Sequence, residues 1–150
     1  VLAPVPLSAS HVGWGSIRLE PVWMQVGESA AYAAALAIKN KSTPAALNPD
    51  QLIRKLASSH VMITFFNDVD VTSSDPRIAA AQYFGTKGFF ASYDARLDAP
   101  LTTAVRTAWE HPADPMQTAM AVHAAETQNS PATDQTRGAF LLTLWQQLKP

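Results

Sequence analysis

The chain has no cysteine and few charged residues, and both shortages narrow what it can do. Without cysteine it forms no disulfide, builds no thiolate metal site and carries no cysteine nucleophile. Charged residues make up 15% of its 150 residues, below the roughly 25% of an average soluble domain. A surface so poor in charge favours contact with another protein surface.

The charges that are present nearly cancel, with 11 Lys and Arg against 12 Asp and Glu. They contain no basic run, whereas a protein that binds nucleic acid needs a basic footprint for the phosphates. No apolar run approaches the roughly 20 residues of a membrane-spanning helix. We therefore expect neither a nucleic-acid partner nor a membrane span, and the absence of cysteine leaves the compartment open.

The first part of the chain predicts a strand, a loop and a helix. Residues 1–7 (VLAPVPL) predict an edge strand, because their prolines cannot lie inside a hydrogen-bonded sheet. Residues 8–20 predict a loop with several ionisable side chains. Residues 22–39 then predict a helix, which Pro21 is suited to start and which Gly27 weakens.

The later part of the chain predicts a series of short helices. Asn48-Pro49 predicts the start of a helix, and from about residue 68 four more short helices follow, three of them introduced by Asp-Pro or Pro. The composition changes near Phe65–Asp70. We therefore place a boundary between residues 1–66 and 67–150. The predicted fold class is mainly α, with a short N-terminal strand and a helix fragment followed by a small bundle of short helices.

One resemblance to a known family lies in residues 8–38, around the run GSIRLEPVWM. This segment resembles the C-terminal end of the catalytic part of bacterial FAD-dependent oxidoreductases, also described as xanthan lyase-like or as glutathione-reductase-type flavoproteins. The residues that match the family pattern are Ser8, Ser10, His11, Gly15, Ser16, Ile17, Arg18, Glu20, Pro21, Val22, Met24, Gly27, Ser29 and Ala30.

The resemblance implies a helix that directs its N-terminus toward a flavin. There the helix dipole and free N–H groups favour the negative charge that collects on the reduced ring. It further implies that His11 and Arg18 act in catalysis. The cofactor contacts that it implies are Ser10, Gly15, Ser16, Pro21 and Val22.

Two of these residues also have plain structural interpretations. His11 is either a proton donor or substrate ligand beside the flavin or a loop histidine bonded to the backbone. Arg18 either binds an anion or the electron-rich flavin edge or pairs with Glu20. Residue types alone leave both choices open.

Half of a complete FAD site has no counterpart in the sequence. No Gly-x-Gly-x-x-Gly follows a strand in this chain, and that motif holds the pyrophosphate of a dinucleotide. Where the family has Gln and Gly, the chain has Glu28 and Ala31. We therefore expect FAD in the parent protein, bound with an N-terminal FAD-binding part of the same protein as partner, and not by this chain alone.

A second resemblance covers residues 65–109, which are similar to a surface-layer-homology repeat. The matching residues are Phe66, Asp68, Val69, Ala81, Tyr83, Lys87, Gly88, Phe89, Tyr93, Pro100, Leu101 and Thr102, with a fading second copy at Thr136, Arg137 and Phe140. Such repeats bind cell-wall polysaccharide largely through a Thr-Arg-Ala-Glu portion. That portion is broken in the first copy and lacks Glu in the second, which favours a packing role.

We interpret the chain as the C-terminal fragment of an FAD-dependent oxidoreductase that transfers hydride between an unidentified small-molecule substrate and the flavin, inactive by itself. Two alternatives stay open: a module that binds cell-envelope glycan, and a purely structural helical domain. The family resemblance implies a periplasmic or secreted location.

Overall fold

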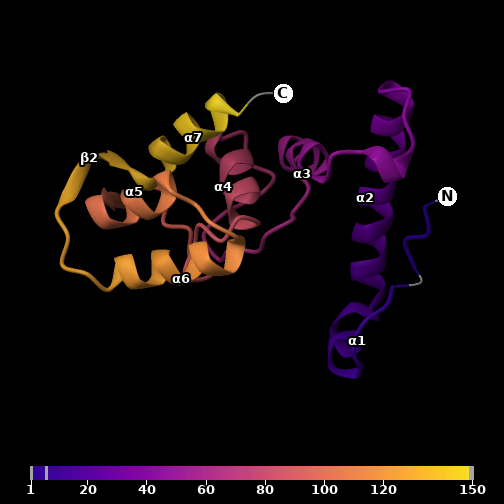
Figure 1. Ribbon diagram of the computed structural model, residues 1–150, viewed down its shortest axis with the longest axis horizontal. Coiled ribbons are helices and arrows are strands. Elements are labelled where there is room, and N and C mark those ends of the chain that lie inside the picture. Colours follow the sequence, from indigo (N-terminus) through magenta and orange to yellow (C-terminus); the bar gives the residue numbers. More distant parts are fainter. Residues whose placement is uncertain (1, 6, 149–150) are drawn as a thin grey trace. The chain divides into compact units, whose positions relative to one another are not determined.

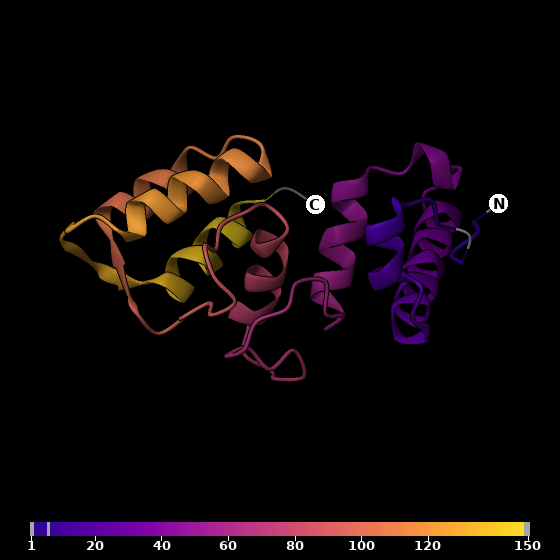
Figure 2. The ribbon, with the colours of Figure 1, turned by 90° about the horizontal axis from the view of Figure 1, so that it is seen from below.

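The computed structural model describes residues 2–5 and 7–148 (Figures 1 and 2). Its helices are α1 (His11–Ile17), α2 (Glu20–Lys39), the 3-10 helix η1 (Pro44–Ala46), α3 (Pro49–Ser58), α4 (Arg77–Gly85), α5 (Thr103–Glu110), α6 (Pro115–Glu126) and α7 (Arg137–Gln147). Its strands are β1 (Pro100–Thr102) and β2 (Ala132–Thr136). The predicted mainly α class is confirmed.

Contacts within the chain divide it into two compact units, Val1–Leu56 and Ala57–Pro150. The first unit holds α1, α2, η1 and most of α3, and the second holds α4 to α7 with both strands. Within the described residues, every helix is too short or too polar to cross a membrane. The functional division into residues 1–66 and 67–150 stays a prediction.

The long helix of the first unit, α2, forms where the sequence predicts it. Pro21 lies in its first turn, where the missing N–H leaves no helical bond unmade. Glu20 and Lys39 place opposite charges at the two ends, each at the end that the helix dipole favours. Ala33 and Ala37 are buried, so small residues make the covered face and let its neighbours approach closely.

The start of α3 is also confirmed. The Asn48 side chain accepts a hydrogen bond from the Asp50 N–H at 2.9 Å, which satisfies a donor at the helix start. A second bond ties α3 to the end of α2, where the Asn40 amide donates to Gln51 Oε1 at 3.1 Å. Local capping chemistry thus decides this boundary.

Gly27 in the middle of α2 needs no special conformation, because a Cβ built there meets nothing within 4 Å. Glycine inside a helix costs about 1 kcal/mol relative to alanine. Gly27→Ala is therefore expected to stabilise α2 by about 1 kcal/mol, seen as slower amide hydrogen exchange along the helix. Faster exchange in the variant would show that the glycine has a conformational purpose.

The two strands belong to the second unit. They pair antiparallel, with Pro100 opposite Thr136 and Thr102 opposite Ala132. Each strand leads directly into a helix whose N-cap is its last threonine, and the two threonine hydroxyls accept backbone N–H bonds at 3.4 and 3.2 Å. Because the strands are antiparallel, α5 and α7 start at opposite ends of the pair.

The strand predicted at the N-terminus is not observed among the described residues. Among residues 1–7, the described residues 2–5 and 7 form no strand. A strand needs a hydrogen-bonding partner. The proline-containing sequence favours an extended backbone but does not provide that partner. β1 and β2 find each other only because the chain between them folds back through α5 and α6.

Stacked aromatic rings form the core of the second unit. Phe89 stacks on Phe84 with ring centres 4.7 Å apart, and Trp109 lies between Phe89 and Phe140 at 5.7 and 6.3 Å. The Trp109 indole also donates to the Phe89 carbonyl at 2.7 Å, which satisfies its buried N–H. Around these rings α4 packs on α7 and α5 packs on α6 (Figure 1).

Helix α4 ends at Gly85, three residues before Gly88. Gly88 lies in the following turn with φ +79°, a left-handed conformation that glycine adopts at little cost. A Cβ at this position would overlap the carbonyl oxygen of Pro115. The glycine therefore lets this turn lie directly against the start of α6.

Candidate functional site

Residues 11–17, predicted as part of a loop, form helix α1. The Ser10 side chain caps it by accepting a hydrogen bond from the Gly13 N–H at 3.2 Å. Two glycines in seven residues lower the helix propensity of this segment. The prediction of a loop rested on that propensity and did not take the Ser10 cap into account. No residue of α1 is buried.

The site residues predicted on this segment are spread along α1. His11 is its first residue and Arg18 its C-cap. Seven residues of helix separate them by about 10 Å along the axis. Gly15 and Ser16 lie between them and are exposed. Within this unit, therefore, His11 and Arg18 are not brought together.

The stability of α1 depends on one capping atom, the side-chain oxygen of Ser10. Ser10→Ala removes the acceptor for the Gly13 N–H, and such losses destabilise a helix by about 1 kcal/mol. Amide exchange at Gly13 and Trp14 is expected to speed up about fivefold. Ser8→Ala, at an exposed position outside the cap, is the matched control. Equal exchange in the two variants would mean that the cap does not hold α1.

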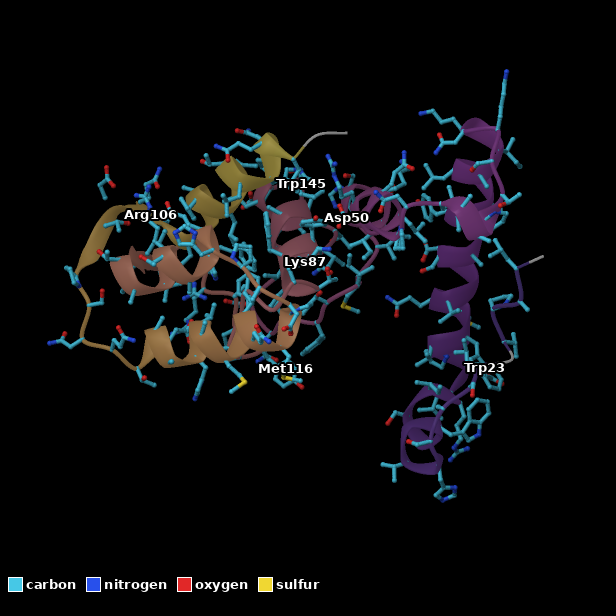
Figure 3. All side chains as sticks on the ribbon, viewed as in Figure 1. Trp23, Asp50, Lys87, Arg106, Met116 and Trp145 are labelled. Carbon is cyan, nitrogen blue, oxygen red and sulfur yellow. The ribbon has the colours of Figure 1, made fainter. Side chains whose placement is uncertain are left out.

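The turn between α1 and α2 is the better candidate for a site. A hollow of about 460 Å³ lies there, lined by Arg18, Leu19, Glu20, Pro21 and Trp23. Leu19 is the N-cap of α2 and offers the helix no side-chain acceptor. The indole Nε1 of Trp23 is buried and has no hydrogen-bond partner among the described residues. Trp23 lies at the end of α2 that follows α1 (Figure 3).

This turn is rich in donors. The guanidinium of Arg18, the indole N–H and the positive end of the helix dipole all attract electron-rich atoms. The predicted contact Val22 already uses its N–H, which donates to the Leu19 carbonyl at 3.1 Å. Glu20, the acidic residue of the first turn, competes for the donors. The turn can therefore bind an electron-rich group, and its residues include no nucleophile paired with a base.

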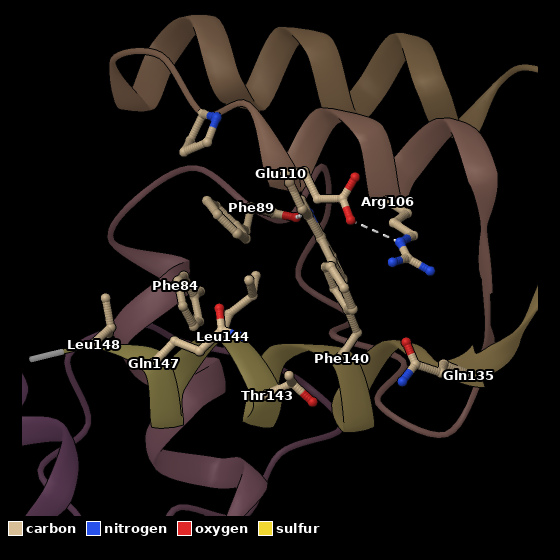
Figure 4. A pocket seen from close by; sticks show the side chains of 12 residues that line it. Phe84, Phe89, Arg106, Glu110, Gln135, Phe140, Thr143, Leu144, Gln147 and Leu148 are labelled. Carbon is tan, nitrogen blue, oxygen red and sulfur yellow. Dashed lines mark hydrogen bonds and ion pairs between the residues drawn. The ribbon is translucent and has the colours of Figure 1, made fainter.

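The second unit has a larger pocket, of about 560 Å³, between α5 and α7 (Figure 4). Arg106 and Glu110 form an ion pair at its edge, with Nε 2.9 Å from Oε1. The pocket wall also contains the aromatic side chains Phe84, Phe89, Trp109 and Phe140. It offers apolar contact beside one ion pair. Sequence reasoning missed it, because its walls come from elements far apart in the chain.

Arg137, the arginine of the surface-layer-like motif, is a core residue that is 5% exposed. Its Nη1 donates to Glu126 Oε1 at 2.8 Å and its Nε to the Ala95 carbonyl at 3.2 Å. The guanidinium lies 5.0 Å from the Trp109 ring centre and 5.9 Å from that of Phe90. Burial lowers the pKa of Arg137, and the Glu126 carboxylate opposes that shift. These contacts hold the fold together.

Aspartates in the loops around α4 are likewise committed to the fold. Asp68 accepts the backbone N–H groups of Ala95 and Arg96 at 2.8 and 2.7 Å. Hydrogen bonding from Arg77 lowers the pKa of Asp75. No group of three or more acidic or histidine side chains in residues 2–5 and 7–148 is placed to hold a metal ion.

Comparison with known proteins singles out the first unit. The family model described as FAD dependent oxidoreductase matches residues 1–56. That range supports an FAD-dependent oxidoreductase region and contains every residue predicted for the site. Searches of curated proteins and of solved structures found no match. The surface-layer resemblance of the second unit stays a prediction.

Proposed function

We propose that residues 1–56 contribute the flavin-facing helix start of an FAD-dependent oxidoreductase, whose dinucleotide-binding part lies on further polypeptide of the same protein. One observation carries this proposal. The range that matches the oxidoreductase family contains a helix start without a side-chain cap. Beside it lies a buried indole N–H that has no partner among residues 2–5 and 7–148.

The residues at this turn fit a flavin by the chemistry of their donors. FAD, when bound, provides the group that accepts a hydride. Arg18 and the N-terminal end of α2 would hold the electron-rich edge of the ring, where negative charge collects on reduction. The indole of Trp23 would donate to a carbonyl acceptor. Pro21 shapes the helix start without using a donor.

The residues of α1 are proposed for roles that need the completed site. Ser10 already caps α1, while Gly15 and Ser16 are exposed on it. Their proposed cofactor contacts require this helix to lie on the flavin. His11, exposed at its start, is proposed as proton donor to the substrate, with Arg18 stabilising charge.

The test uses the longer parent polypeptide that includes the dinucleotide-binding part. We expect it to be yellow, with a flavin band near about 450 nm. Arg18→Ala is expected to lower the reduction potential of the bound flavin, since a positive charge beside it is lost. Lys39→Ala removes the same charge from the other end of α2 and should leave the potential unchanged. A colourless parent protein, or equal effects of both variants, would refute the proposal.

For the second unit we propose a structural role, and the burial of Arg137 against Glu126 and Trp109 supports it. A glycan-binding arginine has to be reachable, whereas this one is almost fully covered. Pull-down on peptidoglycan-bearing cell walls should therefore retain no protein. Retention that is lost in a folded Arg137→Lys variant would instead favour the glycan-binding alternative.

A further inference from the structure

The second unit has another hollow, of about 360 Å³, whose walls are rich in aromatic rings. Half of its lining residues are aromatic, namely Phe65, Phe66, Phe90 and Tyr93, and the space that they enclose is here called the aromatic hollow. Among the lining residues that the structure describes, none carries a charge. Phe66 is buried against Phe90, with ring centres 4.7 Å apart. The hollow is therefore an uncharged space with an aromatic wall.

Phe65 and Tyr93 are the exposed rings of this hollow. They are 56% and 70% exposed, although burial of an aromatic ring is strongly favourable. The two rings meet at an angle of 65°, with their centres 6.1 Å apart. The cation–ring contacts of the described residues involve other rings. The two exposed rings thus offer apolar surface and ring faces to a ligand.

Hydrogen bonds hold the first wall of the hollow on α4. The buried Gln82 accepts the backbone N–H groups of Ile63 and Thr64 at 2.9 Å each. A Cβ at Gly85 would lie 2.6 Å from the Thr64 side chain, so the glycine lets this segment lie close against the end of the helix. The backbone that leads into Phe65 is therefore fixed.

The second wall is tied to the first through Asn67. Its backbone N–H donates to the Tyr93 carbonyl at 2.8 Å, and its side-chain amide donates to the Asp94 carboxylate at 2.9 Å. The two exposed rings are thus carried by segments that are already joined. A site that is formed before its ligand arrives loses less conformational freedom on binding.

The chemistry of the hollow favours one kind of ligand. Aromatic faces carry negative charge, and walls of such rings recognise quaternary ammonium groups. Asp94, which directly follows Tyr93, is an exposed acidic residue. The nearby Arg137, 5.9 Å from the Phe90 ring centre, is paired with Glu126. A primary ammonium is strongly hydrated, whereas a methylated one brings apolar methyl groups to the rings and needs no hydrogen-bond acceptor.

We infer that the aromatic hollow binds a quaternary ammonium group, which lies against Phe65 and Tyr93. The group combines a positive charge with an apolar surface, and the hollow combines negative ring faces with an uncharged wall. This site is independent of the proposed flavin site, because every residue that forms it belongs to the second unit. It adds a ligand to the structural role proposed for that unit.

Titration of the 150-residue chain with choline, followed by two-dimensional NMR, tests the site. Choline should shift the amide signals of residues 64–66 and 90–93 in a saturable way. Its neutral analogue 3,3-dimethylbutan-1-ol has nearly the same shape, with carbon in place of the charged nitrogen. The analogue should bind about tenfold more weakly, because the ring faces attract the charge.

Variants at the two exposed rings locate the binding. Phe65→Leu and Tyr93→Leu keep an apolar side chain but remove the ring, and each should weaken choline binding by about fivefold. Both positions are exposed, so the variants are expected to fold. Tyr32→Leu is the matched control, since it removes a tyrosine ring of the first unit that already has Lys55 5.7 Å from its centre. It should leave choline binding unchanged.

Vesicles of phosphatidylcholine distinguish two sources of the group. Co-sedimentation of the chain with these vesicles, reversed by free choline, would assign the group to a lipid headgroup. Choline binding without co-sedimentation would assign it to a soluble molecule. Either result supports the inference.

Three results would overturn the inference. Equal affinities for choline and for its neutral analogue would mean that the hollow takes apolar groups regardless of charge. Unchanged choline binding in both leucine variants would place the binding elsewhere. The absence of saturable shifts at residues 64–66 and 90–93 would mean that the hollow does not bind this group.

Discussion

Arg137→Ala is expected to lower the free energy of unfolding of the second unit by about 3 kcal/mol, the lower end of the cost of breaking a buried ion pair. The change removes one of the two arginines that pair with the partly buried Glu126 carboxylate, which keeps Arg96 at 2.9 Å, and it leaves the Ala95 carbonyl without its donor. It also removes the guanidinium from the face of Trp109. Since a domain is stable by only about 5 to 15 kcal/mol, this loss removes a large share of the stability of the unit. Urea unfolding followed by near-ultraviolet circular dichroism measures the loss.

Arg106→Ala is the matched control for this prediction. Arg106 also pairs with a glutamate, Glu110, at 2.9 Å, but both side chains are substantially exposed. Exposed pairs of this kind contribute about 0.3 to 0.5 kcal/mol, and the Arg106 guanidinium, 5.1 Å from the Phe140 ring centre, adds about 0.5 to 1 kcal/mol. A loss in Arg137→Ala as small as that in Arg106→Ala would show that burial does not set the importance of the pair.

Gly88→Ala is expected to destabilise the second unit by about 4 kcal/mol or more, in the range that marks a specific structural conflict. Alanine at φ +79° is strained by about 1 to 2 kcal/mol. Its methyl group would also overlap the carbonyl oxygen of Pro115. Because that atom belongs to the backbone of α6, relief requires the helix to move away. Thermal unfolding gives the change in stability.

The same substitution at Gly27 serves as the control, because there an added methyl group meets open space. The two glycine-to-alanine changes should therefore have opposite signs, each read in its own unit. A Gly88→Ala variant whose stability stays within about 1 kcal/mol of the original would mean that the turn relaxes freely, contrary to its close contact with α6.

Sequence reasoning predicted the helices whose starts are decided by neighbouring residues. Pro21, Asn48 and Asp114 act within one turn of their own helix, so their effect is visible in the sequence. Helix α1 was missed because a single capping oxygen on Ser10 outweighs two unfavourable glycines. The strands were missed because each depends on a partner about 30 residues away.

The candidate sites, like the fold, could be predicted from the sequence only in part. The donor-rich start of α2 follows from consecutive residues, and the sequence indicated it. The covering of Arg137 depends on Glu126, Ala95 and Trp109, which come from three separate segments. The sequence pattern of a Thr-Arg motif does not contain that information. Recognition of a motif thus identified the residue, and only packing showed what surrounds it.

The position of α7 in the chain has a consequence for synthesis. Its first residue bonds to Ala95, 42 residues earlier, and its helix covers α4. Closing so long a loop carries an entropy cost that only the finished packing offsets. While α4, α5 and α6 leave the ribosome, their apolar faces stay uncovered. They are covered only when α7, which is translated after them, has emerged. The second unit therefore closes only after α7 has emerged, and a ribosome stalled before residue 137 would hold an aggregation-prone intermediate.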